Sequence, residues 1–300
     1  MTKRIVSLLP SATEIVAALG VADWMVGRSH ECDWPESLSE LPMLTAQRTK
    51  ASESAEIDAE VRAALKEGTS LYTLESDTLI ALAPDIIVTQ DLCDVCSIDL
   101  ATVRGAARRM EPQPEVLSLD PKSLEEVLDD LLKVGRALGI DQRAEEVHQD
   151  LWRRVEAATR APGQNPPKVA FIEWMDPIFV GGHWTPQLIE RAGGLHPLNP
   201  AGAKSIVVSP QDVVDLAPDY LVCAPCGYRL EQTCAEWETL TRIDGWESIP
   251  AVKHGRVALA DGNALFNRPG PRLVDALEAL SSWLEQDIIP ERAEWMAPPT

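Results

Sequence analysis

Hydrophobic positions alternate between short apolar, β-branched runs and longer stretches with apolar residues every three or four positions. The runs at 4–9 and 85–89 predict buried strands, and runs at 168–173 and 219–222 predict two more. Between them, the stretch from Leu124 to Leu138 has helical spacing and ends at Gly139. Strands that alternate with helices favour mainly parallel sheets with helices on both faces.

A near-repeat relates the two halves of the chain. Leu-Ala-Pro-Asp followed by an apolar run occurs at 82–88 and again at 216–222, each time after a helical pattern. The proline is expected to end a helix and the aspartate to open a buried strand. The alternative is that this tetrapeptide is only a common helix-to-strand junction.

The repeat predicts an α/β fold of two similar lobes with mainly parallel sheets. We expect an amino-terminal lobe over 1–120, a helical connector over 121–160 and a carboxyl-terminal lobe over 167–290. Within the connector, the pattern from 141 to 160 predicts one long linker helix of about 30 Å.

Composition narrows the class of protein. A formal net charge of -20 argues against a nucleic-acid partner, and no apolar run is long enough to insert into a membrane. The first ten residues are too short for a secretory segment, and six cysteines are too sparse for a disulfide scaffold. We therefore expect a cytoplasmic monomer, or a periplasmic or cell-surface protein if a signal segment has been removed.

Four segments carry a resemblance to a known family: 5–14 (IVSLLPSATE), 29–35 (SHECDWP), 91–96 (DLCDVC) and 267–272 (NRPGPR). Two α/β lobes joined by one long helix and opening with 5–14 resemble the helical-backbone substrate-binding proteins of ABC importers, a class that handles cobalamin, haem and siderophores. The other three segments resemble the cobalamin-binding branch of this class. The resemblance implies a corrinoid (cobalamin, vitamin B12) in a cleft between the lobes and an ABC permease as partner; a cytoplasmic cobalamin carrier is the alternative.

Ligands of open parallel sheets bind beyond the carboxyl ends of the strands, so the loops that follow the predicted strands supply the candidate site. Flat indoles suit a planar macrocycle, and a loop histidine can ligate cobalt or act as an ordinary hydrogen-bonding residue. The predicted ligand-binding residues are Pro10, Ser11, Thr13, His30, Cys32, Trp34, Leu92, Cys93, Cys96, Glu173, Trp174, Gly182, His183, Trp184, Cys226, Tyr228, Asn267 and Arg268.

Two Cys-x-x-Cys pairs follow equivalent predicted strands. Cys93 and Cys96 in one half, with Cys223 and Cys226 in the other, have spacing that suits zinc or an iron-sulfur cluster. Small buried loop cysteines are the plainer interpretation.

The sequence lacks the common catalytic motifs, among them Gly-x-Ser-x-Gly, the phosphate loop and His-Glu-x-x-His, so we expect a binding protein and no enzyme. Two rival hypotheses remain open. One is a haem or iron-siderophore binding protein of the same fold, and the other is a cysteine-ligated metal or redox protein.

Overall fold

A computed structural model describes residues 2–67, 69–90, 98–287 and 296–298. The chain divides into two units. The first comprises Met1–Ser52, Glu56–Pro121 and Glu125–Asp150, and the second comprises Glu53–Ala55, Lys122–Leu124 and Leu151–Thr300. Helix α6 (Asp141–Ala158) starts in the first unit and ends in the second, so the prediction of one long helix over this stretch is confirmed.

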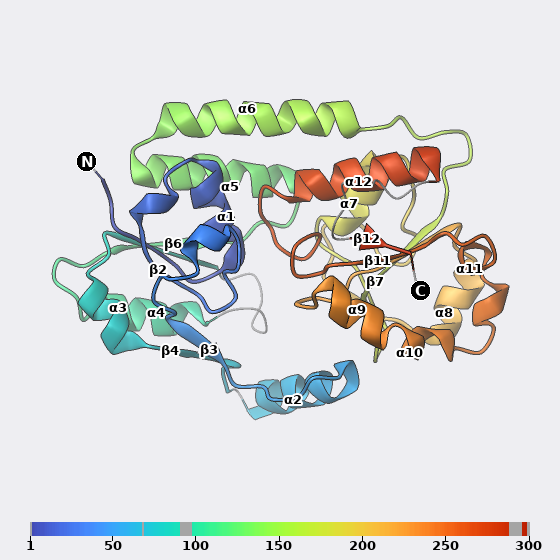
Figure 1. Cartoon of the computed structure of the whole chain (residues 1–300), viewed down its shortest axis with the longest axis horizontal. Coiled ribbons are helices and arrows are strands. Elements are labelled where there is room, and N and C mark those ends of the chain that lie inside the picture. The colour runs from blue at the N-terminus through green and yellow to red at the C-terminus, as the bar shows by residue number, and fades with distance from the viewer. Residues whose placement is uncertain (1, 68, 91–97, 288–295, 299–300) are drawn as a thin grey trace. The chain divides into compact units, whose positions relative to one another are not determined.

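The first unit is built on a four-stranded sheet in the order β2-β1-β5-β6, and all its pairings are parallel. A separate antiparallel pair joins β3 to β4. Each predicted strand of this half exists, although β1 is shorter than the apolar run that predicted it. The elements are β1 (Ile5–Ser7), α1 (Pro10–Ala18), η1 (Ala22–Trp24), β2 (Met25–Arg28), η2 (Glu36–Leu38), β3 (Thr45–Gln47), α2 (Ser54–Glu67), β4 (Tyr72–Leu74), α3 (Ser76–Leu82), β5 (Ile86–Gln90), α4 (Leu100–Ala107), β6 (Glu115–Leu119) and α5 (Leu124–Leu138) (Figure 1).

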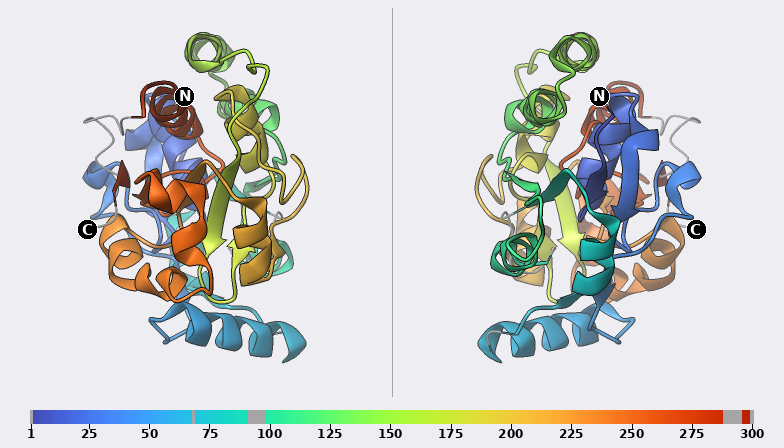
Figure 2. Two further views of the ribbon diagram at one scale, coloured as in Figure 1. Left: turned by 90° about the vertical axis from the view of Figure 1, so that its right-hand side faces the viewer. Right: turned by 90° about the vertical axis from the view of Figure 1, so that its left-hand side faces the viewer.

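The second unit has a six-stranded sheet in the order β12-β11-β10-β7-β8-β9. Its centre, β7, β10 and β11, is parallel, whereas β8, β9 and β12 pair antiparallel. Helices lie on both faces of this sheet (Figure 2). The elements are β7 (Val169–Trp174), β8 (Phe179–Val180), α7 (Thr185–Arg191), β9 (Ile206–Val207), α8 (Pro210–Leu216), β10 (Tyr220–Cys223), α9 (Leu230–Glu236), α10 (Glu238–Thr241), η3 (Trp246–Ser248), α11 (Pro250–Lys253), β11 (Val257–Ala260), α12 (Leu273–Gln286) and β12 (Met296–Ala297).

The first copy of the sequence repeat is held by a defined set of contacts in the first unit. Ala83 ends α3 in the left-handed region at φ 42°, which turns the chain into β5. The carboxylate of Asp85 accepts a hydrogen bond of 2.7 Å from the Arg4 backbone N–H, and the Arg4 guanidinium donates to the Leu82 carbonyl. The helix end is thereby tied to the start of β1.

The second unit repeats this arrangement. Ala217 ends α8 at φ 49°, Asp219 accepts 2.9 Å from the Lys168 backbone N–H, and Lys168 Nζ donates to the Leu216 carbonyl at 2.9 Å. The same left-handed alanine and the same two polar contacts at both places favour a structural repeat over a chance junction.

The core of the first unit forms on a sheet face covered by α3 and α4. Val6 and Ile87 point to this face from adjacent strands and pack with Leu79 and Val103. Ile5 and Ile86, their neighbours along the strands, are also fully buried but point to the opposite face. Burial on both faces explains why these strands are uninterrupted apolar runs.

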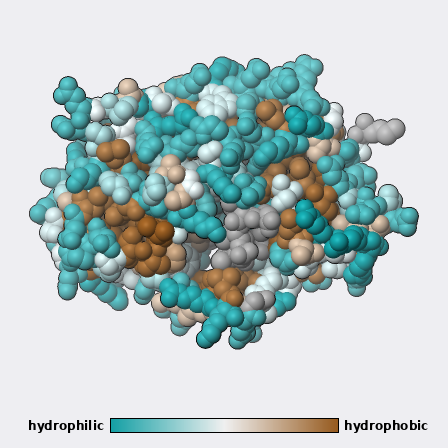
Figure 3. Space-filling view, turned by 180° about the vertical axis from the view of Figure 1, so that it is seen from behind, coloured by the Kyte–Doolittle hydropathy of each residue, from teal (hydrophilic) through white to brown (hydrophobic). Residues whose placement is uncertain are grey.

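Hydrophilic residues predominate on the molecular face in Figure 3, where hydrophobic residues gather in separate patches. No helix among the described residues is long and apolar enough to cross a bilayer. The large hydrophobic side chains that remain exposed are Trp34, Met43, Leu65, Leu195, Ile206 and Val207.

Candidate ligand-binding site

A buried polar cluster supports the first loop of the first unit. Thr13 is fully buried, and its Oγ1 lies 2.9 Å from Ser7 Oγ and 3.0 Å from Cys32 Sγ. Ser11 is also buried, whereas Pro10 is half-buried at the start of α1. The Thr13 hydroxyl therefore joins β1 and α1 to the loop that carries His30 and the other predicted residues of 29–35.

Arg28, at the end of β2, holds that loop in place. Its guanidinium donates to the carbonyl oxygens of Ser29 at 3.2 Å, Cys32 at 3.1 Å and Ser39 at 2.6 Å. Because the arginine side chain is itself buried, these bonds replace those it would make to water. Arg28 thus fixes the loop through its backbone carbonyl groups.

His30 sits in a polar network that its segment alone does not reveal. Its Nδ1 lies 2.7 Å from Thr45 Oγ1, and its ring is 5.7 Å from the ring of Tyr72. Burial, aided by the positive charge of Arg28, lowers the pKa of His30 below its usual value. The imidazole is therefore neutral at neutral pH.

Tyr72 and Glu31 complete the network. The Tyr72 hydroxyl donates to Glu31 Oε1 at 3.0 Å, and this carboxylate oxygen is 4.0 Å from His30 Nε2. Sequence reasoning missed Tyr72 and Thr45, which belong to the small β3-β4 pair. Glu31 could have been found, because it lies inside the segment that carries the family resemblance.

The side chain of Trp34 is exposed, unlike that of Cys32 in the same loop. Its relative accessibility is 41%, against 3% for Cys32 in the same loop. An exposed indole next to a fixed polar loop offers a flat surface to a ligand.

In the second unit, Glu173 and Trp174 lie at the carboxyl end of β7. Both Glu173 oxygens accept from Ser205 Oγ at 2.9 Å. The Trp174 ring packs edge-to-face on the Tyr228 ring at 5.3 Å, and its Nε1 donates to the Asp176 carbonyl. The structure thus brings together three predicted residues from the end of β7 and the loop after β10.

The loops after β10 and β11 also meet. Asn267 Nδ2 donates to the Ala224 carbonyl at 2.8 Å, and Arg268 Nη2 donates to Asn263 Oδ1 at 2.7 Å. Asn263 in turn donates its backbone N–H to the Tyr228 carbonyl at 2.9 Å. Asn267 and Arg268 therefore belong to one hydrogen-bonded cluster with the loop of Tyr228.

Gly182, His183 and Trp184 follow β8. Trp184 is only 5% exposed and donates its Nε1 to the Phe266 carbonyl at 2.5 Å, which leaves little of the predicted stacking face accessible. A Cβ on Gly182 would lie 2.5 Å from the Ala203 carbonyl oxygen, so only glycine fits this close approach. His183 has φ 52° and its ring lies 5.5 Å from that of Trp184.

The predicted cysteine cluster is only partly within the described residues. Leu92, Cys93 and Cys96 lie outside them. Cys223 is completely buried, and burial raises the pKa of its thiol, whereas Cys226 is exposed. Within the described ranges no three His, Cys, Asp or Glu side chains are grouped to hold a metal ion. Zinc or iron-sulfur ligation therefore remains a prediction.

The fold and the loops at its strand ends define a class of binding protein. A family model for periplasmic binding proteins matches residues 5–264, and the chain belongs to this family. It is 26% identical to the uncharacterised ABC transporter substrate-binding lipoprotein YvrC of Bacillus subtilis, with 96% of this chain and 82% of that protein covered. It is 24% identical to a vitamin B12-binding protein of Vibrio vulnificus, with 92% and 88% covered.

Solved structures share the fold. The periplasmic haem-binding protein RhuT of Roseiflexus sp. RS-1 has a TM-score of 0.70 at 26% identity, with 95% of this chain and 98% of that chain covered. The periplasmic vitamin B12-binding protein BtuF of Vibrio cholerae has a TM-score of 0.66 at 20% identity, with 94% and 96% covered. The chain is thus a member of the periplasmic binding protein family, and the relatives named here are binding proteins rather than enzymes.

The predicted cytoplasmic location is wrong. The family is that of periplasmic binding proteins, and the relatives are named as a substrate-binding lipoprotein of an ABC transporter and as periplasmic binding proteins. The prediction rested on the first residues and on the sparse cysteines. Neither feature determines the compartment in which the folded chain works.

Proposed function

We propose that the chain binds a corrinoid such as cobalamin and delivers it to an ABC permease. Relatives named vitamin B12-binding proteins support this ligand. The observation on which the choice between corrinoid and haem depends is the state of the three tyrosines. Haem iron in proteins is held by a His, Cys, Met or Tyr side chain, whereas cobalamin carries its own axial base.

Each tyrosine hydroxyl is already engaged with a carboxylate. Tyr72 donates to Glu31, Tyr220 donates to Asp287, and Tyr228 shares a hydrogen bond with Glu236. Burial raises the pKa of Tyr220 to about 12 and that of Tyr228 further still. A phenolate ligand to haem iron forms only when the phenol loses its proton. Burial and the negative charge of the neighbouring carboxylate both oppose this loss, so tyrosinate ligation is disfavoured.

The histidines of the strand-end loops are similarly enclosed. Nε2 of His30 has no solvent-exposed surface, and its Nδ1 is close to Thr45. Nδ1 of His183 is enclosed as well. Direct ligation of a metal by either ring nitrogen would require these loops to rearrange, whereas contacts to corrin amides require no metal ligand from the protein.

The proposed contacts match the chemistry of a corrin edge. In the first unit, Trp34 supplies a flat apolar face and the Glu31 carboxylate accepts from amide N–H groups. In the second unit, Glu173 is a further acceptor, and Trp174 and Asn267 offer aromatic and amide groups. The other predicted ligand residues support these loops.

The test is calorimetric titration of the whole chain with cyanocobalamin and with haemin. We expect one cyanocobalamin per chain, and weakening by about tenfold in Trp34→Ala through loss of an aromatic contact. Trp24→Ala is the matched control, because Trp24 precedes β2 whereas Trp34 follows it. Absence of cyanocobalamin binding would refute the proposal, and equal weakening in both variants would refute the role of Trp34.

Haem is the second candidate, and one observation favours it. Cys226, in the loop after β10, has an exposed thiol, and thiolates are known haem ligands. A haem-binding chain should show a haemin absorbance band that changes in Cys226→Ser, whereas cyanocobalamin binding should not depend on this thiol.

A further inference from the structure

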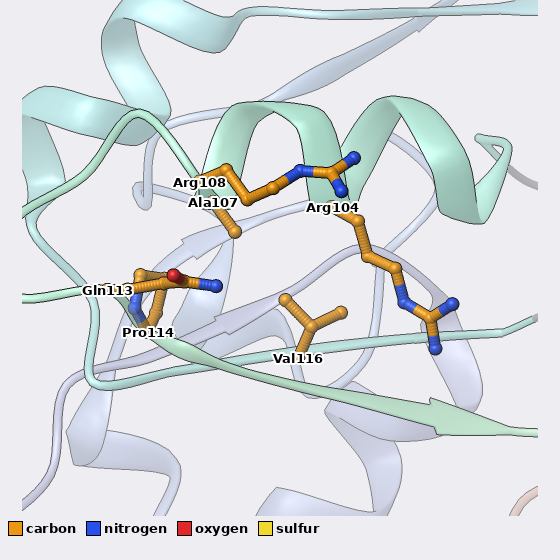
Figure 4. A pocket seen from close by; sticks show the side chains of 6 residues that line it. All are labelled: Arg104, Ala107, Arg108, Gln113, Pro114 and Val116. Carbon is orange, nitrogen blue, oxygen red and sulfur yellow. The ribbon is translucent and has the colours of Figure 1, made fainter.

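A groove in the first unit lies apart from the strand-end loops described above. It has a volume of about 190 Å³, which is small for a cofactor but sufficient for one or two side chains. Val116 points from β6 toward α4, while two arginine side chains extend from the helix beside it (Figure 4). The lining residues are Arg104, Ala107, Arg108, Gln113, Pro114 and Val116.

The two arginines carry uncompensated charge. Both side chains are exposed, and neither guanidinium makes a hydrogen bond or an ion pair with any part of the chain that the structure describes. Their neighbour Arg109, in contrast, lies 3.7 Å from Asp77. Like charges one helical turn apart repel each other, so the pair weakens α4 rather than stabilising it.

This concentration of positive charge is unusual in a chain with a net charge of -20. Acidic side chains outnumber basic ones by 47 to 27, yet none of the six residues that line the groove is acidic. Glu115 precedes Val116 on β6, so the alternation of a strand directs it to the other face. The groove therefore has a charge opposite to that of the molecule as a whole.

Strand β6 supplies a second feature. It is the last strand of the four-stranded sheet, and edge strands offer backbone N–H and C=O groups to another chain. Ala107, Pro114 and Val116 give the groove an apolar floor beside this edge. The groove thus combines two basic side chains from the α4 segment with apolar side chains beside a sheet edge, a combination that suits an extended peptide.

We propose that the α4–β6 groove docks an extended acidic segment of a partner protein. Arg104 and Arg108 hold a carboxylate side chain of that segment, whose next apolar side chain lies on Val116. Paired guanidinium-carboxylate bonds are strong and geometrically specific, which gives an acidic segment the advantage over a neutral one. The proposal is independent of the corrinoid, because the groove lies outside the proposed ligand contacts.

The probe is the peptide acetyl-(Glu-Val)3-amide, titrated into the isotope-labelled full chain and followed by NMR. We expect shifts confined to residues 104–119 and binding weakened by about tenfold in the double variant Arg104→Gln, Arg108→Gln. The control Arg62→Gln, Arg136→Gln makes the same charge change at exposed positions of other helices and should bind like the parent.

Three outcomes would overturn the proposal. The first is no binding or shifts elsewhere, the second is equal weakening in both double variants, and the third is equal affinity for the matching Gln-Val peptide. Sedimentation adds a fourth, since a dimer that dissociates only in the Arg104, Arg108 variant would replace the partner by a second copy. Cyanocobalamin affinity should be the same in parent and variant whichever outcome is found.

Discussion

Replacing Asp130 with asparagine should make the first unit more stable at neutral pH. Asp130 lies on α5 with a fully buried side chain, and Lys133 Nζ approaches its Oδ1 at 2.6 Å. Burial raises the pKa of Asp130 to about 6. The hydrogen bond and positive charge of Lys133 lower this pKa, whereas the negative charges of Glu126 and Asp129 raise it further. A rise from 3.8 to about 6 corresponds to about 3 kcal/mol of penalty on the ionised folded state.

The sign of the pH dependence follows from this direction. The folded chain binds the Asp130 proton more tightly than the unfolded chain, so the penalty is small below pH 4, grows between pH 4 and 6, and is complete above about pH 7. The stability of Asp130→Asn relative to the parent should therefore rise by about 2 kcal/mol between pH 4 and pH 8.

Urea unfolding at a series of pH values, followed by circular dichroism, measures this difference. Glu145→Gln removes the same charge from an exposed position of α6 and should give a nearly constant difference. A constant difference for Asp130→Asn as well would show that Lys133 compensates the buried charge in full and would refute the reasoning.

Three further predictions concern stability and can be read from the same unfolding curves. Ala83→Gly should leave the free energy of unfolding unchanged or raise it by up to about 1 kcal/mol, because Ala83 has a positive φ that glycine adopts without strain. Ala63→Gly within α2 should lower this free energy by about 1 kcal/mol, and the reverse order would contradict backbone strain at Ala83. Asp85→Ala and Asp219→Ala should each lower the free energy of unfolding by about 1 kcal/mol. A large difference between the two losses would contradict the structural repeat. Arg154→Met should destabilise the second unit by about 1 kcal/mol by removing part-exposed ion pairs to α12, with a smaller loss at high salt; no salt dependence would count against the ion pairs.

The sequence predicted the elements whose signal is local. The helices over 124–138 and 141–158 follow from apolar spacing and from glycine at 139, and the repeated strands follow from proline and aspartate before an apolar run. Strands β8, β9 and β12 have two residues each, too few to show a period, and their pairing depends on distant partners. For this reason the antiparallel edges of the second sheet could not be predicted.

The candidate site was predictable only as a set of loops. The rule that ligands lie beyond strand carboxyl ends selected the loops of Pro10, Trp174 and Tyr228, whereas the segments of His30 and Asn267 came from the family resemblance. The rule could not reveal that Tyr72 and Thr45 support His30, because they come from strands outside the main sheet. Trp184 has glycines nearby and resembles an exposed loop residue, yet its hydrogen bond to Phe266 buries it.

The most direct test is equilibrium dialysis of the chain against equal concentrations of cyanocobalamin and haemin, with both retained ligands quantified by absorbance. We expect close to one cyanocobalamin per chain and little haemin, because each tyrosine hydroxyl is paired with a carboxylate and the rings of His30 and His183 are enclosed. Retention of haemin in place of cyanocobalamin would contradict this expectation.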